Sequence, residues 1–345
     1  MKNKFILLLM FILFNGFTTF GQVTEVVGNL SQPWGIFLDG NDLYIAENGK
    51  DQIIKLEIDA PMDGVEKVVD GLGGASGVIL IDSLLYIGQR KDNIVSSFDI
   101  NGENTKAKYV TDLASAPVGF AIDGDNLYIA TRDGNRVLRL DLSTKSEKTI
   151  VRDLTFSYDV VLHGNYLFIS EDKRVSKIDL TLDDPKPVAV LNNLNTPIGL
   201  LIHGDELYVA EFSANQVLKI NVVKENAVAT KVATGLGGPI SMAISNDELY
   251  ISEYNTGTIS KVKIDVPSKV DDIHSDVTLV FPNPTQDYIY FKDALIENKF
   301  KIFNTNGINI LEGVIQNNQI DIRHLSIGTY FISRPENKTI QFIKK

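Results

Sequence analysis

Short apolar runs separated by turn residues recur along most of the chain. A phrase of Leu, an aromatic residue and a β-branched residue returns six times, and its aromatic residues are at positions 44, 86, 128, 168, 208 and 250. The spacings between them are 42, 42, 40, 40 and 42 residues. A fixed period of this size is typical of repeat architectures, in which each repeat is one supersecondary unit.

Each repeat contains four strand-like runs. The first follows a Pro or a small residue, as at 33–38, and a turn such as Asp39-Gly-Asn-Asp42 leads into the Leu-aromatic phrase. The third run alternates apolar and polar residues, as at 137–142, and the fourth is looser and ends near a Leu. Four antiparallel strands in a repeat of about forty residues predict a blade of a β-propeller.

The two ends of the repeat region complement each other. The sixth repeat has no fourth run after 259–264, whereas 23–27 matches the fourth-run pattern without a preceding repeat. We therefore expect the N-terminal strand to complete blade six, which leaves no open sheet edge in the ring. The sequence predicts an all-β fold, with a six-bladed β-propeller over residues 22–265.

The N-terminus predicts export. Lys2 and Lys4 precede the apolar run 5–14, and small residues lead to Gly21, which predicts a secretory signal peptide over 1–21 with cleavage after Gly21. The apolar run is too short to span a bilayer comfortably, and no later segment predicts a transmembrane helix. The chain has no cysteine, so disulfides, cysteine metal ligands and a cysteine nucleophile are excluded.

The charge balance is acidic. The formal net charge is -11 and the pI is about 4.9. A chain of this charge repels phosphate backbones, so nucleic acid is excluded as an expected partner. The charge is compatible both with a solubilising surface and with a role that involves cations.

The last part of the chain has a different pattern. After a polar linker at 266–277, it contains the motifs 281–285, 302–307 and 325–331 and ends in two lysines. These motifs resemble the C-terminal sorting domain of the type IX secretion system of Bacteroidetes, over 278–345. The resemblance implies a small β-sandwich that the type IX translocon reads, and a protein that is secreted or held at the outer cell surface.

Ligands of a propeller are expected on the face where the first strands begin, because the loops between second and third strands open there too. Trp34 and Tyr158 are the two large aromatic residues at the beginnings of the first strands. Such residues suit stacking against a sugar or a flat ligand, although packing within the channel or between blades is the alternative.

A partly acidic ring is predicted where the second strands end, formed by Glu47, Gln89, Thr131, Glu171, Glu211 and Glu253. Carboxylates could bind a divalent cation such as calcium, for which Glu47, Asp159 and Glu211 are the candidate ligands, or could act as acid and base. Alternatively, they accept backbone hydrogen bonds from a neighbouring loop, which is a structural role that suits a repeated position.

Four residues break the repeat and are sharper candidates: Arg90, Arg132, Asp133 and Asp159. An arginine here could clamp a carboxylate or a sulfate, and a solvated loop charge is the alternative. His163 and His203 are expected in turns on the opposite face. The sequence contains no Ser-His-Asp set, zinc motif or glycine-rich phosphate loop.

The segments 33–36, 39–47 and 52–56 resemble NHL-type repeats and the related propellers of streptogramin lyases and of the gluconolactonase/regucalcin family. Streptogramin lyases have seven blades and a functional histidine, which this chain does not match. Gluconolactonases have six blades and a channel metal, but this chain has Gln32-Pro33-Trp34 where they have a metal-binding Glu.

Two functions remain open from the sequence. The first is a secreted or cell-surface module that binds a small molecule, a glycan or a protein. The second is a metal-dependent hydrolase, lactonase or lyase that acts on a sugar-like substrate.

Overall fold

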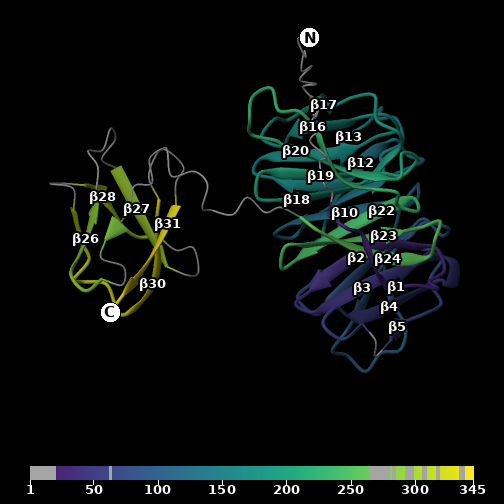
Figure 1. Ribbon diagram of the computed structural model, residues 1–345, viewed down its shortest axis with the longest axis horizontal. Coiled ribbons are helices and arrows are strands. Elements are labelled where there is room, and N and C mark those ends of the chain that lie inside the picture. The colour runs from purple at the N-terminus through teal and green to yellow at the C-terminus, as the bar shows by residue number, and fades with distance from the viewer. Residues whose placement is uncertain are drawn as a thin grey trace, which may run out of the picture. The chain divides into compact units, whose positions relative to one another are not determined.

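The computed structural model describes residues 21–61, 64–264, 280–281, 285–291, 299–304, 309–315, 319–333 and 339–345 (Figure 1). Most of the predicted signal peptide and the whole predicted linker lie outside these residues. The chain forms two compact units, Met1–Val266 and Pro267–Lys345, which are described separately. Within the described residues, no helix has the length and apolar character needed to cross a membrane.

The first unit is a β-propeller of six four-stranded antiparallel sheets. Blade one contains β2 (Pro33–Asp39), β3 (Asp42–Glu47), β4 (Gln52–Glu57) and β5 (Glu66–Val69), with the 3-10 helix η1 (Asn48–Lys50) between β3 and β4. Blade two contains β6 (Ala75–Ile81), β7 (Leu84–Gln89), β8 (Ile94–Asp99) and β9 (Lys108–Asp112). Blade three contains β10 (Pro117–Asp123), β11 (Asn126–Thr131), β12 (Arg136–Asp141) and β13 (Glu147–Val151).

The remaining blades have the same strand order. Blade four contains β14 (Val160–His163), β15 (Tyr166–Ser170), β16 (Val175–Asp179) and β17 (Val188–Leu191). Blade five contains β18 (Pro197–His203), β19 (Glu206–Glu211), β20 (Gln216–Asn221) and β21 (Thr230–Thr234). Blade six contains β22 (Pro239–Ser245), β23 (Glu248–Glu253), β24 (Thr258–Lys263) and, from the other end of the chain, β1 (Thr24–Val27).

The ring closes as the sequence predicts. Strand β1 pairs antiparallel with β24, with Thr24 opposite Lys261 and Glu25 opposite Ser260. The first strands of successive blades contact one another, and β22 of blade six contacts β2 of blade one. The six first strands therefore surround a central channel, and the final blade has its full set of strands.

The hydrophobic pattern explains the packing of the blades. In the second strand of blade one, Leu43, Tyr44 and Ile45 are all buried, because both faces of this strand are covered. In the third strand of blade three, Leu138 and Leu140 are buried while Arg139 between them is half-buried. Removing these apolar faces from water between neighbouring blades is the main stabilising contribution in such a fold.

Glycine at the channel allows the first strands to approach one another closely. A Cβ added to Gly199 of blade five would lie 2.0 Å from the carbonyl oxygen of Ile240 in blade six, and one added to Gly77 would lie 2.8 Å from that of Val118. A side chain does not fit at these positions without a shift of the backbone. Blade four has Asp159 at this position.

The second unit is a small β-sandwich, as the sequence predicts. One sheet contains β25 (Val280–Phe281), β26 (Tyr288–Phe291) and β29 (Gln319–Asp321). The other contains β27 (Lys299–Asn304), β28 (Asn309–Val314), β30 (Gly328–Ser333) and β31 (Thr339–Lys344). Residues of both sheets, among them Ile289, Ile302 and Ile332, share one buried apolar core.

Candidate functional site

The side chain at the end of the second strand holds the loop that leads into its own blade. In five blades this side chain accepts a hydrogen bond from the backbone N–H sixteen residues upstream. The pairs are Ser31 with Glu47, Gly73 with Gln89, Thr155 with Glu171, Asn195 with Glu211, and Gly237 with Glu253. These side chains thus accept backbone hydrogen bonds from a loop, which is the structural role that the sequence analysis gives as the alternative to binding or catalysis.

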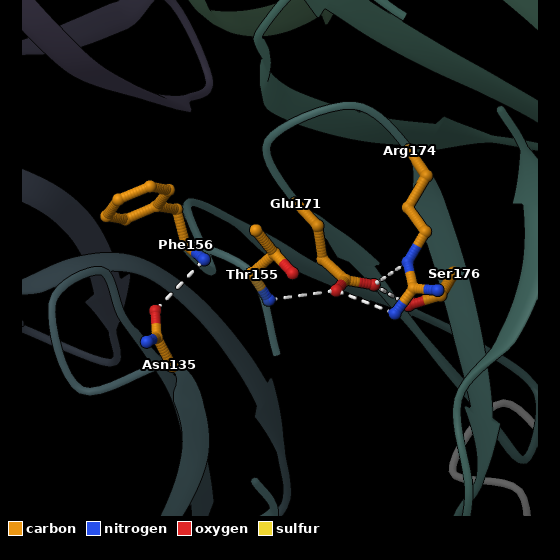
Figure 2. A network of polar contacts seen from close by, with 6 residues as sticks. All are labelled: Asn135, Thr155, Phe156, Glu171, Arg174 and Ser176. Atoms are coloured by element: carbon orange, nitrogen blue, oxygen red, sulfur yellow. Dashed lines mark hydrogen bonds and ion pairs between the residues drawn. The ribbon is translucent and has the colours of Figure 1, made fainter. Parts of the chain in front are cut away.

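Blade four has the most complete of these anchors (Figure 2). The Glu171 carboxylate accepts from the Thr155 N–H at 3.1 Å, from Nε and a terminal nitrogen of Arg174 at 2.7 and 2.9 Å, and from the Ser176 hydroxyl at 2.7 Å. Glu171 is completely buried. Its hydrogen bond raises the pKa of Arg174, as expected for a bidentate, charge-assisted pair.

The anchor of blade one uses a lysine. Glu47 Oε1 lies 2.6 Å from Lys50 Nζ, and the Gln52 amide also donates to this carboxylate. Burial alone would raise the pKa of Glu47, but the hydrogen bonds from Lys50, the Ser31 N–H and Gln52 together bring it below its ordinary value. The carboxylate is therefore charged and already satisfied by donors of its own blade.

The predicted metal ligands do not come together. Glu47 and Glu211 hold loops in blades one and five, whereas Asp159 faces the channel from blade four. In the described part of the chain, no group of three or more His, Cys, Asp or Glu side chains could hold a metal ion. The described residues therefore do not fit the channel metal that the gluconolactonase resemblance implies, or a calcium ion bound by these three carboxylates.

Asp159 is the one acidic side chain with a carboxyl group among the described residues that line the channel cavity. One carboxylate oxygen accepts from the Val160 N–H at 2.9 Å, and the other accepts from the Leu200 N–H of the next blade, also at 2.9 Å. Burial raises the pKa of Asp159 to about 7, although the two N–H groups favour the charged form. The small exposed part of its surface faces the channel.

The channel cavity has a volume of about 330 Å³ and is lined by all six first strands. Apolar residues dominate its wall, and Asp159 and Ser241 are polar exceptions. Ser241 Oγ accepts from the Ile36 N–H at 3.2 Å, so blade six does with a hydroxyl what blade four does with a carboxylate. The volume lies at the lower end of the range of small-molecule sites, which is about 300–1,000 Å³.

Trp34 lies at the end of the channel and is packed on two sides. The Arg90 guanidinium lies over its ring at 4.4 Å from the centroid, and Tyr254 meets it edge-on at 5.6 Å. Trp34 itself is buried, so its ring packs against Arg90 and leaves little surface for a ligand. Burial lowers the pKa of Arg90, and the nearby charge of Arg132 lowers it further, while Tyr254 and Asp133 favour its charged form.

Arg132 has a similar environment on blade three. Its guanidinium lies 5.8 Å from the ring centroids of both Phe156 and Tyr158. Asp133 is exposed and approaches Arg132 only to 3.9 Å, and the buried Nε of Arg132 has no hydrogen-bond partner among the described residues. We use the term channel mouth for the set Trp34, Arg90, Arg132, Phe156, Tyr158 and Tyr254.

Phe156 holds an unusual backbone conformation at the channel mouth. Its φ is +52°, a region that disfavours bulky side chains, and the equivalent residues of four other blades share a positive φ: Gln32, Gly74, Thr196 and Gly238. The Asn135 Oδ1 accepts from its N–H at 3.0 Å, as Figure 2 shows, which helps to hold this conformation. The ring remains 41% exposed beside Arg132. Because the positive φ belongs to the repeat, it is the exposed aromatic ring beside Arg132 that makes Phe156 a candidate for ligand contact.

The sequence prediction missed Phe156 and Tyr254. Tyr254 occupies the same repeat position as Arg90 and Arg132, one residue after the end of the second strand. Aligning that following residue across the repeats gives Asn48, Arg90, Arg132, Asp172, Phe212 and Tyr254, a varied set that would have marked the channel mouth.

Comparison with known families identifies the second unit. Residues 279–345 match the family described as "Secretion system C-terminal sorting domain". This is the domain that the type IX resemblance predicts, so the protein is one that is secreted or reaches the cell surface. No curated protein sequence matches the chain.

Solved structures similar to the propeller differ in what their names describe. A luciferin-regenerating enzyme is 14% identical, with a TM-score of 0.61 over 71% of this chain and 96% of the other. A putative gluconolactonase is 10% identical, with a TM-score of 0.60 over 70% and 92%. An auxiliary nutrient binding protein from Bacteroides thetaiotaomicron is 12% identical, with a TM-score of 0.58 over 70% and 75%. At these identities the likeness shows the fold alone.

Proposed function

We propose that the propeller is a secreted binding module, exported by the type IX secretion system, whose channel mouth takes a ligand with both a flat or apolar part and an anionic group. The observation that supports this most directly is the pair Arg90 and Arg132, each placed over aromatic rings on the same face. A small molecule or a glycan with an acidic group has this chemistry.

The charges at the channel mouth favour a ligand with an anionic group. The chain has a net charge of -11, yet this face brings together two arginines, and the charge of Arg132 is close enough to lower the pKa of Arg90. Within the described residues, Arg90 has no carboxylate at ion-pair distance, and Arg132 has only the exposed Asp133 at 3.9 Å. A ligand carboxylate or sulfate between the two guanidinium groups would relieve their repulsion and form charge-assisted hydrogen bonds.

The experiment is a calorimetric screen of acidic oligosaccharides and aromatic carboxylates against the purified protein. For a ligand that binds, Arg90→Gln and Arg132→Gln should each lower the affinity roughly tenfold or more, the effect of losing one hydrogen bond to a charged group. Affinity should also fall with ionic strength. Arg139→Gln, on the third strand of blade three, is the matched control and should bind normally. Full affinity in both channel-mouth variants would overturn the proposal.

A second candidate function is an acid–base reaction in the channel, such as the hydrolase, lactonase or lyase chemistry suggested by the family resemblance. It is favoured by Asp159, whose pKa of about 7 is suited to proton transfer near neutral pH. Its test is turnover of lactones and sugar acids by the wild type and by Asp159→Ser, which keeps a hydroxyl as in blade six. General-base catalysis predicts a loss of at least about a hundredfold, whereas equal rates would contradict this function.

A further inference from the structure

Blade three lacks the carboxylate that anchors the loop in blade four. Thr131 stands where blade four has Glu171, and its Oγ1 donates to the backbone carbonyl of Arg136 at 3.0 Å. The equivalence follows from the strand register, because Ala130 pairs with Val137 in blade three as Ser170 pairs with Val175 in blade four. One step further along each hairpin, Thr131 lies opposite Arg136 in blade three, and Glu171 lies opposite Arg174 in blade four.

The donors of the anchor are nevertheless present in blade three. Arg136 corresponds to Arg174, which makes the bidentate pair with Glu171, and Ser115 corresponds to Thr155, sixteen residues upstream, whose backbone N–H donates to Glu171. The buried Arg136 Nε and the Ser115 Oγ have no hydrogen-bond partner in the described part of the structure. Ser115 is only 7% exposed, so its hydroxyl cannot turn freely towards bulk water.

The Thr131 and Ser115 hydroxyls lie beneath the hairpin that joins β11 and β12, and Arg136 is the strand partner of Thr131. A Cβ added to Gly134 in that hairpin would lie 2.7 Å from Thr131 Oγ1 and 3.0 Å from Ser115 Oγ. The threonine side chain ends at its γ atoms, two bonds short of the glutamate carboxylate oxygens, so it does not extend to where the Glu171 carboxylate meets its donors. Buried donors without an acceptor are unfavourable, and they favour any acceptor that can enter.

We propose that Ser115 and Arg136, beside the short side chain of Thr131, form a site for a carboxylate group from outside the chain, which takes the place that the Glu171 carboxylate holds in blade four. A carboxylate fits because the free groups are donors, one of them a guanidinium that can present two parallel N–H groups. A cation would meet repulsion from Arg136. This site uses none of the channel-mouth residues, so it stands independently of the binding function proposed above.

The test uses acetate as the probe and its neutral isostere acetamide as the ligand control, at constant ionic strength and pH 7. Binding to the folded state raises the midpoint of thermal unfolding in proportion to the occupancy of the site. Acetate should therefore raise the midpoint in a saturable way, whereas acetamide at equal concentration should not. Calorimetry with acetate should give one site, and galacturonate in a parallel titration distinguishes a free small carboxylate from the acid group of a sugar.

Three variants separate the site from general effects of the anion. Arg136→Gln introduces the residue that blades one and five have at this position, and it should lower acetate affinity roughly tenfold or more. Thr131→Glu supplies the carboxylate within the chain, and it should raise the midpoint without acetate and abolish the response to it. Arg174→Gln, the matched change in blade four, should lower the midpoint but keep the response to acetate.

The proposal fails if acetate and acetamide act equally on the wild type, which would mean that water satisfies these donors. It also fails if Arg136→Gln retains the full response to acetate. Should Thr131→Glu not fold, the difference between Arg136→Gln and Arg174→Gln still decides the question.

Discussion

The anchor residue at the end of each second strand and the residue after it are neighbours in the chain but differ in what they contact. The first of the two, as in Glu171 and Glu211, is buried and holds a loop of its own blade. The second, as in Arg90, Arg132 and Tyr254, faces the channel mouth. Successive side chains at a strand end point to opposite sides, so one step along the backbone separates the two environments.

This difference explains why one position repeats and the other varies. A loop anchor needs a similar acceptor in each blade that uses it, and five blades bond the backbone N–H sixteen residues upstream in this way. A ligand surface needs different groups from each blade, because the ligand does not have the symmetry of the ring. Repetition of a carboxylate is therefore a sign of structure here, and the variation beside it is a sign of binding.

The largest effect that tests this comparison is expected from Glu171→Ala. The change leaves the Thr155 N–H, the Ser176 hydroxyl and Arg174 without their common acceptor, and we expect the free energy of unfolding to fall by about 2–4 kcal/mol. Glu171→Gln should cost less, because Gln89 performs the same role in blade two. Urea unfolding followed by the fluorescence of Trp34, the only tryptophan, reports on the propeller alone.

Exposed Glu103→Ala is the control for this measurement, and it should change stability by no more than about 0.5 kcal/mol. If Glu171→Ala were equally neutral, the carboxylates would not be structural anchors. The repeated ring would then again be a candidate for binding or catalysis.

The fold could be predicted from the sequence because the Leu-aromatic phrase repeats with a nearly constant period. Even the pairing of β1 with β24 followed from the sequence, since the sixth repeat lacked a strand that residues 23–27 could supply. The site could be predicted only in part. Arg90, Arg132, Asp133 and Asp159 could be singled out as candidates because each departs from the repeat in its own blade.

Phe156 and the donors of blade three could not be found in this way. Phe156 belongs to the channel mouth because its backbone φ and its contact with Arg132 place it there, and both depend on packing between blades three and four. The unpartnered Arg136 Nε and Ser115 Oγ, within the described residues, can be interpreted only when the hydrogen bonds of blade four are known. A missing acceptor leaves no mark in the sequence beyond a single threonine.

A smaller change in the free energy of unfolding, one that depends on pH, is expected from Asp159 in the channel. Asp159 replaces the glycine of most blades, and burial raises its pKa from 3.8 to about 7 in the folded protein. Between these two values the folded state holds a proton that the unfolded chain has released. Stability is therefore greatest at low pH, falls as the pH rises from about 4 to 7, and then stays at the lower level.

The measurement compares wild type with Asp159→Ser, in which a hydroxyl still accepts from the backbone as Ser241 does in blade six. Other titrating groups are shared and cancel in the difference, so the variant should gain on the order of 1–3 kcal/mol relative to wild type between pH 4 and pH 7.5. Exposed Asp183→Ser should show no such gain. A difference that is flat with pH would mean that the two backbone N–H groups outweigh burial and keep Asp159 charged. Asp159 would then be a loop anchor that happens to face the channel, and only the channel mouth would remain distinct from the repeated framework.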